Sequence, residues 1–152
     1  MTVGTEELIG YCGLYCGDCF GYKGIIPDLA RKLRQELKRE KFDIILQGIP
    51  FKALQDYKQS YAFLGALTRL QCTSGCRSGG GNPFCQVRKC CQKNDIHGCW
   101  ECGEFETCGK LDFLKKNHGN AHFRNLRQLK KKGVADFLQG KRFWISRAKK
   151  SS

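Results

Sequence analysis

The eleven cysteines of this 152-residue chain constrain its fold more than any other feature of the sequence. Eight of them lie in the segment from Cys72 to Cys108, and the other three lie between Cys12 and Cys19. Thiolates two to four residues apart can occupy neighbouring vertices of one tetrahedron around a metal ion. An odd number of cysteines fits a disulfide framework poorly, and such frameworks belong to oxidising compartments. We therefore expect a metal-binding protein of the reducing cytoplasm.

The cysteine-rich segment 72–108 contains little that could form an apolar core. Its centre, residues 79–83, consists of three glycines, an asparagine and a proline, which leave the backbone flexible or turned. Because such a segment cannot fold by apolar burial alone, we expect metal ligation by its own cysteines to order it. The pair Cys99 and Cys102 has the spacing of a zinc knuckle. Two tetrahedral sites would use eight thiols, so the sequence predicts one or two zinc ions.

The N-terminal spacing Cys12-x3-Cys16-x2-Cys19 keeps iron–sulfur chemistry open as an alternative. Radical S-adenosylmethionine enzymes hold a [4Fe-4S] cluster with this spacing, but they depend on a large α/β barrel or part-barrel that this sequence does not predict. Cysteine spacing alone does not separate zinc from an iron–sulfur cluster, so a [4Fe-4S] protein for electron transfer or catalysis remains the alternative interpretation. Three N-terminal ligands would need a fourth from the middle segment, and the metal would then join the two.

Apolar periodicity predicts helices on both sides of the cysteine-rich segment. An amphipathic helix is expected from Ile26 onward, with a charged outer face that includes Arg34. Its apolar stripe consists of Ile26, Leu29, Ala30, Leu33 and Leu37. A second helix is expected from Phe51 to Leu70, covered on several sides and therefore the best candidate for the core. Short helices are expected between Leu111 and Leu138, with breaks at Gly119, Gly133 and Gly140. The segment 143–145 fits either a strand or a docked extended segment.

These patterns predict a mainly α fold, in which a small helical domain carries an irregular cysteine-rich metal-binding lobe with at most a short hairpin or zinc knuckle. We expect a single domain over residues 1–152, with the lobe at 72–108, the N-terminal cysteine motif at 12–19 and a basic helical region at 110–150. No stretch approaches the roughly twenty apolar residues of a membrane span, and the N-terminus has no signal-peptide pattern. We therefore expect no membrane association.

The formal net charge of +13 is concentrated at the C-terminal end of the sequence. Residues 110–152 hold 13 Lys and Arg against two Asp. Basic side chains next to an aromatic ring suit phosphate contacts and base stacking, although a solubilising surface is the commoner explanation. The candidate partner is therefore nucleic acid or an acidic protein, and the candidate contact residues are Arg124, Arg127, Lys130, Lys131, Arg142 and Trp144. Further basic residues are Lys132, Lys141, Arg147, Lys149 and Lys150.

The cysteines have no catalytic set beside them. The sequence contains no paired base, nucleophile elbow or phosphate loop, so a binding or adaptor protein is favoured over an enzyme. Cys91, next to the ligand candidate Cys90, is a leftover thiol that basic neighbours would activate. His97 is expected on the surface rather than in a metal site. His118 and His122 are expected to be solvated residues at helix ends.

The order of the cysteine motifs resembles that of a family of small bacterial and archaeal proteins known as domain of unknown function 3795. The motifs are YCGLYCGDC, CTSGCRSGGG, CQVRKC and HGCWECGEFETCGKL, which together cover residues 11–111. The resemblance implies a zinc-binding protein with no established activity. It implies metal ligands at Cys12, Cys16, Cys19, Cys72, Cys76, Cys85, Cys90, Cys99, Cys102 and Cys108. Cys91 falls outside the motif positions, and the Cys72-x3-Cys76 spacing is one residue longer than usual.

Overall fold

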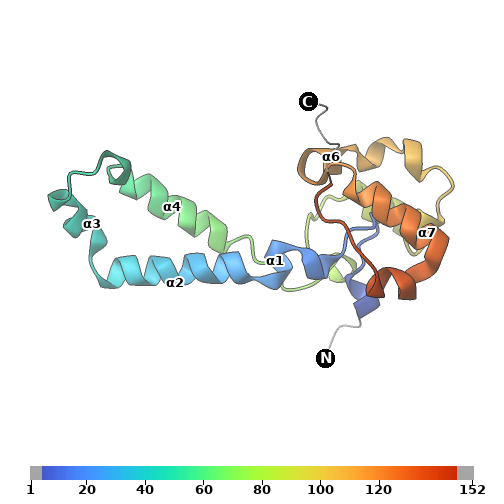
Figure 1. The fold of residues 1–152 in the computed structure, drawn as a ribbon, viewed down its shortest axis with the longest axis horizontal. Coiled ribbons are helices and arrows are strands. Elements are labelled where there is room, and N and C mark those ends of the chain that lie inside the picture. The colour runs from blue at the N-terminus through green and yellow to red at the C-terminus, as the bar shows by residue number, and fades with distance from the viewer. Residues whose placement is uncertain (1–4, 147–152) are drawn as a thin grey trace. The chain divides into compact units, whose positions relative to one another are not determined.

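The computed structural model describes residues 5–146 and divides the chain into two compact units (Figure 1). The cysteine unit combines Met1–Cys19 with Thr73–Ser152, and the hairpin unit is Phe20–Cys72. Seven α-helices and several short 3₁₀ helices form the regular structure of the described residues. Their only β-pairs are isolated bridges, Ile9 with Tyr15 and Gly119 with Ser146. The predicted mainly α fold is confirmed.

The hairpin unit consists of two long antiparallel helices and two short ones. In chain order they are α1 (Phe20–Lys23), α2 (Ile25–Arg39), α3 (Phe42–Ile45) and α4 (Tyr57–Thr68). Helices α2 and α4 lie side by side as the two arms of the hairpin (Figure 1). Between the arms, the guanidinium of Arg34 lies 4.3 Å from the centre of the Tyr61 ring. The helix predicted from Ile26 is therefore present, and it begins one residue earlier.

The predicted orientation of α2 is partly wrong. Leu29 and Leu33 were expected to face inward, but they are 60% and 48% exposed, and Ile26 is also exposed. Ala30 of the predicted stripe is buried as expected, Pro27 is buried as well, and Arg34 faces α4 rather than solvent. Small side chains let two helices approach closely, and the apolar stem of an arginine can cover a neighbouring ring. The burial of α2 therefore follows its contacts with α4 rather than the whole apolar stripe predicted from the sequence.

Helix α4 is not the core of the protein, in contrast to the prediction. It begins at Tyr57 rather than at Phe51, because a separate 3₁₀ helix occupies Lys52–Leu54. None of the α4 residues is buried. A pair of helices covers each member on one side only, so several apolar residues of α4, such as Phe63, stay exposed.

The main hydrophobic core lies in the cysteine unit, around α7 (Ala121–Gln139). Ala121 and Leu126 of α7 are fully buried, as is Leu111 just before α6 (Asp112–His118). The N-terminal cysteine loop packs closely against the same helix. Gly13 has a φ of 83°, and a Cβ at this position would lie 2.9 Å from the Leu126 side chain. A glycine is therefore needed where the cysteine loop meets the core.

The chain after α7 docks as an extended segment, one of the two predicted forms. The Asn125 side chain accepts a hydrogen bond from the Phe143 N–H at 2.9 Å and donates one to the Phe143 carbonyl at 2.8 Å. The predicted glycine breaks are confirmed: Gly119 and Gly140 follow the ends of α6 and α7, and Gly133, with a φ of 83°, interrupts α7. The basic residues Arg147, Lys149 and Lys150 lie outside the described residues.

The cysteine-rich segment contains one helix that its loop-like composition did not predict. Helix α5 (Gln86–Lys93) begins directly after Cys85, whose sulfur accepts a hydrogen bond from the Arg88 N–H at 3.5 Å. A cysteine thus takes the capping position that Ser or Asp usually occupies. No helix between residues 5 and 146 is long and apolar enough to cross a membrane.

Candidate metal centre

Nine of the eleven cysteines form two clusters within the cysteine unit. The inner thiol cluster consists of Cys12, Cys16, Cys76 and Cys85. The pocket thiol cluster consists of Cys90, Cys91, Cys99, Cys102 and Cys108, which line one pocket. Eight of these nine residues are ligand candidates from the sequence, and Cys91 is the ninth.

The inner thiol cluster joins the N-terminal cysteine motif to the start of the cysteine-rich segment. A tight turn holds Cys12, in which the Gly10 N–H donates to the Leu14 carbonyl at 2.7 Å. The Cys76 N–H donates to the sulfur of Cys16 at 3.5 Å. Backbone N–H donors of this kind favour the ionised form of a sulfur. Residues 60 positions apart in the sequence therefore face one another across this cluster.

A buried arginine lies against the inner thiol cluster. Arg88 is 9% exposed, and its guanidinium donates to the carbonyls of Cys76, Gly80 and Asn82 at 2.9, 2.8 and 2.8 Å. These three bonds hold the glycine-rich loop, residues 76–82, in place. Among residues 5–146, no ion pair joins Arg88 to a carboxylate. Burial raises the pKa of the Cys76 thiol, and the positive charge of Arg88 offsets part of this increase.

Burial raises the pKa of two of the inner thiols, Cys12 and Cys76, which therefore stay protonated when no metal is bound. The pKa of Cys12 is raised to about 12, mainly by burial and also by the neighbouring sulfurs of Cys76, Cys85 and Cys16. Cys12 and Cys76 therefore become anionic at neutral pH only when something binds and stabilises their thiolates.

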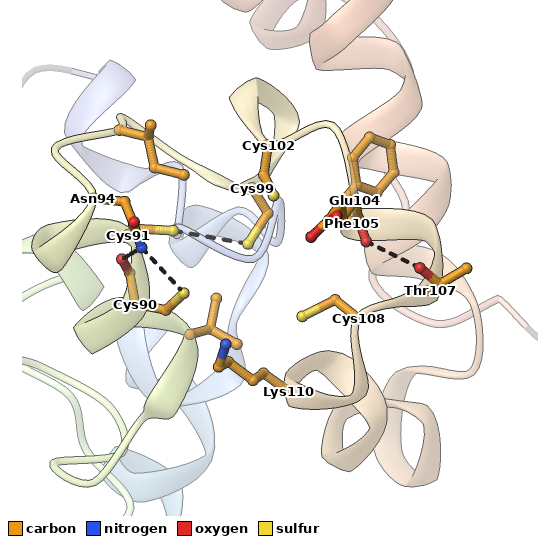
Figure 2. Close-up of a pocket in the computed structure, with 12 residues that line it drawn as sticks. Cys90, Cys91, Asn94, Cys99, Cys102, Glu104, Phe105, Thr107, Cys108 and Lys110 are labelled. Carbon is orange, nitrogen blue, oxygen red and sulfur yellow. Dashed lines mark hydrogen bonds between the residues drawn. The ribbon is translucent and has the colours of Figure 1, made fainter.

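The pocket thiol cluster surrounds a pocket of about 440 Å³ (Figure 2). Cys90 and Cys91 come from α5, and Cys99 and Cys102 come from one 3₁₀ turn, in which the Cys102 N–H donates to the Cys99 carbonyl at 3.0 Å. Cys108 lies across the pocket from α5, with Lys110 nearby (Figure 2). Three separate segments thus supply sulfurs to one space.

Two contacts within the pocket distinguish its thiols. The sulfurs of Cys91 and Cys99 lie 3.8 Å apart, and this contact, together with burial, raises the pKa of Cys99. The Lys110 ammonium pairs with the sulfur of Cys90, which raises the pKa of Lys110. Arg88 therefore lies beside the inner cluster and Lys110 beside the pocket cluster, where Arg77 also acts on Cys91. The sequence did not predict these positions, since basic residues are common throughout the chain.

The remaining two predicted ligands, Cys19 and Cys72, lie at the two points where the chain passes from one unit to the other. The Cys19 N–H donates to the Cys16 carbonyl at 2.9 Å, so the Cys16-x2-Cys19 segment forms a tight turn. Cys72 is the last residue of the hairpin unit, and its N–H donates to the Gly21 carbonyl at 2.9 Å. In the described part of the chain, no three His, Cys, Asp or Glu side chains converge closely enough to hold a metal ion.

The histidines divide between surface and core. His97 is exposed, as predicted. The prediction that His122 is solvated is wrong, because His122 is fully buried and neither ring nitrogen has a hydrogen-bond partner. Burial and, to a smaller extent, the nearby charges of His118 and Lys115 lower the pKa of His122 to about 4. His118 is half-buried, and its Nδ1 lies 2.8 Å from the Trp144 carbonyl oxygen.

Several basic residues predicted to contact nucleic acid have partners within the chain. Arg127 forms two hydrogen bonds with the Glu106 carboxylate, at 2.7 and 2.6 Å. Arg142 pairs with Asp18 at 3.1 Å. The remaining candidates are Arg124 over the Phe143 ring, Lys130 near the Phe105 ring, the exposed Lys131, and Trp144 against the His118 ring. Binding to nucleic acid or to an acidic protein stays a prediction.

One family model matches this chain, and its description is Protein of unknown function (DUF3795). The match covers residues 8–113, which include both thiol clusters and the cations beside them. No curated protein and no solved structure matches the chain.

Proposed function

The chain belongs to the DUF3795 family, and we propose that it is a zinc-binding protein built around two cysteine-ligated centres. The observation that carries this proposal is Arg88, a buried guanidinium whose charge acts on the Cys76 sulfur and pairs with no carboxylate of the described residues. A buried charge without a counter-ion destabilises a fold by several kcal/mol. Four thiolates around one Zn²⁺ leave about two negative charges, which would neutralise Arg88.

The two thiol clusters supply one ligand set each. Cys12, Cys16, Cys76 and Cys85 form the inner centre, and Cys90, Cys99, Cys102 and Cys108 form the pocket centre. Zinc binding requires the sulfurs to turn inward to about 3.8 Å from one another, the edge of a tetrahedron with Zn–S bonds of about 2.3 Å. Cys91 is left out of the pocket set. Consecutive residues on a helix point about 100° apart, so Cys90 and Cys91 do not share one tetrahedron.

Zinc would supply the order that the cysteine-rich segment lacks. A structural zinc ion contributes on the order of 10 kcal/mol, as much as the whole stability of an ordinary domain. The inner centre would hold the N-terminal cysteine loop against the glycine-rich loop, which Arg88 already ties by three hydrogen bonds. We assign a structural role to the metal and a binding or adaptor role to the protein, with exposed basic residues such as Lys131 available to an acidic partner.

The experiment is to purify the full chain anaerobically, record its absorption spectrum and count metals per chain. The proposal predicts a colourless protein with two zinc ions. A brown protein with iron and inorganic sulfide would replace zinc by a [4Fe-4S] cluster and make electron transfer the better function. A folded chain without metal would overturn both.

A further inference from the structure

The sulfurs of Cys91 and Cys99 form a close pair at the wall of the pocket. Figure 2 shows the two sulfurs joined by a dashed line. They lie 3.8 Å apart, and Cys91 and Cys99 are only 1% and 9% exposed. Cys91 comes from α5, whose neighbouring cysteine belongs to the proposed ligand set, and it has no role in that set itself. A thiol beside a ligand sulfur is positioned to react with that sulfur rather than with the metal.

The backbone around the pair holds the two sulfurs at this separation. The Ile96 N–H donates to the Cys91 carbonyl at 3.1 Å, which folds the chain back after α5. The Cys99 N–H donates to the Tyr11 carbonyl at 2.9 Å. A disulfide bond has an S–S length of about 2.05 Å, so bond formation requires the sulfurs to approach by about 1.8 Å. Side-chain rotation can supply much of this distance without separating the two segments.

The pocket gives small oxidants access to the pair. Both cysteines line the pocket of about 440 Å³, together with Asn94, Glu104 and Lys110. A hydroperoxide is far smaller than this space, and the polar side chains can solvate it there. The pair therefore combines two features of an oxidisable dithiol, a short sulfur–sulfur separation and an accessible wall.

We propose that Cys91 and Cys99 form an oxidative modification site whose substrate class is hydroperoxides. The Cys91 sulfur attacks the distal peroxide oxygen and breaks the O–O bond, giving a sulfenic acid on Cys91 and releasing an alcohol, or water from hydrogen peroxide. The Cys99 sulfur then attacks the sulfenic sulfur of Cys91, the S–O bond breaks, and water leaves with the Cys99 proton. Overall, two thiols lose two hydrogen atoms and become a disulfide, while one hydroperoxide is reduced.

Oxidation has a second consequence, which rests on the proposed function. Because Cys99 belongs to the pocket ligand set, a Cys91–Cys99 disulfide withdraws one of four ligands and weakens the pocket centre. The inner centre shares no ligand with the pair and keeps its metal. The protein would then release one zinc ion in response to peroxide and rebind it after reduction.

The test treats the anaerobically purified full chain with stoichiometric hydrogen peroxide. Peptide mass spectrometry after thiol alkylation locates the disulfide, and a chromogenic chelator measures released zinc. We expect a Cys91–Cys99 disulfide, release of one zinc of two, and recovery with dithiothreitol. Cys91→Ala should bind two zinc ions and release zinc at least about tenfold more slowly, because it lacks the sulfenic acid that Cys99 attacks. Cys91→Ser is a second variant in case the alanine leaves a destabilising cavity.

The outcomes separate this inference from the proposed function. Equal release from the wild-type protein and both variants would overturn the inference, as would a disulfide that joins other cysteines. Loss of one zinc from the purified Cys91 variants would show that Cys91 is a ligand and would also overturn it. Absence of zinc from the purified wild type would contradict the proposed function alone, and the mapped disulfide would still decide the fate of the thiol pair.

Discussion

The guanidinium of Arg88 donates a hydrogen bond to the main-chain carbonyl of Cys76 at 2.9 Å, and its charge acts on the sulfur of the same residue. One side chain therefore positions a candidate ligand and provides its counter-charge. The same guanidinium also binds the carbonyls of Gly80 and Asn82, so the loop depends on it.

Replacement of Arg88 by methionine should empty the inner centre. Arg88→Met removes three buried hydrogen bonds and the positive charge, so we expect the zinc count to fall from two to one and the free energy of unfolding to fall by about 3 kcal/mol. Metal analysis and urea denaturation measure the two effects. Lys89→Met, at an exposed position next to Arg88, is the matched control and should change neither value. An Arg88→Met protein with two zinc ions and unchanged stability would contradict the role of Arg88.

The two centres should lose their metals independently. Cys16→Ser removes a ligand of the inner centre and Cys102→Ser removes one of the pocket centre, so each variant should keep one zinc ion. The double variant should keep none, because a site of three thiolates binds zinc much more weakly than a site of four. Metal counts on the folded variants test this, with Ser60→Ala in the hairpin unit as the control. Loss of both ions from either single variant would show that the clusters are one centre.

The buried His122 should make stability depend on pH. Its pKa in the folded protein is about 4, below the ordinary value near 6.5. Between these two values the unfolded chain binds a proton at His122 that the folded protein does not bind, so acid favours unfolding. The charges of His118 and Lys115 oppose protonation, and Asp112 favours it. Between about pH 7.5 and about pH 5.5, His122 should reduce the free energy of unfolding by about 1 kcal/mol.

His122→Leu should remove this part of the pH dependence. Urea denaturation of the variant and the wild type over the same pH range measures the free energy of unfolding of each. The difference between the two isolates the contribution of His122, because acid affects the thiolates of both proteins equally. His97→Gln, at an exposed position, is the control and should keep the full dependence. A His122→Leu protein with the wild-type slope would show that His122 is protonated or partnered in the folded state.

Asn125 should be the main attachment of the C-terminal segment. It is fully buried, and its side-chain amide satisfies both backbone groups of Phe143. Asn125→Leu keeps the volume but leaves a buried N–H and carbonyl without partners, so we expect a loss of about 2–3 kcal/mol in the free energy of unfolding. Asn117→Leu, on the exposed side of α6, is the control. Hydrogen exchange at Phe143 should rise in the Asn125 variant, and unchanged protection would contradict this attachment.

Local signals predicted the helices and their ends better than they predicted which helix faces are buried. The breaks at Gly119, Gly133 and Gly140 follow from glycine's own conformational freedom. The predicted orientation of α2 was partly wrong because it depends on the contact of Arg34 with Tyr61, which periodicity does not encode. The burial of His122 was missed for a similar reason, since only the packing around α7 makes that position part of the core.

The sequence predicted ten ligand candidates but not their grouping. The separation of the N-terminal motif from the middle segment pointed to a ligand set drawn from both, and the structure places Cys16 beside Cys76. It did not indicate that α5 divides the middle cysteines, with Cys85 facing the inner cluster and Cys90 lining the pocket. That division depends on the helix geometry of residues 86–93, whose composition resembles a loop.

The coordination of the metal is the most direct test of the central claim, that two all-cysteine centres bind zinc. X-ray absorption at the zinc edge of the anaerobically purified protein measures it without any substitution. We predict about four sulfur atoms at about 2.3 Å around each zinc ion, with no shell of nitrogen or oxygen at about 2.0 Å. A nitrogen or oxygen shell, or a protein that contains no zinc to measure, would contradict the account.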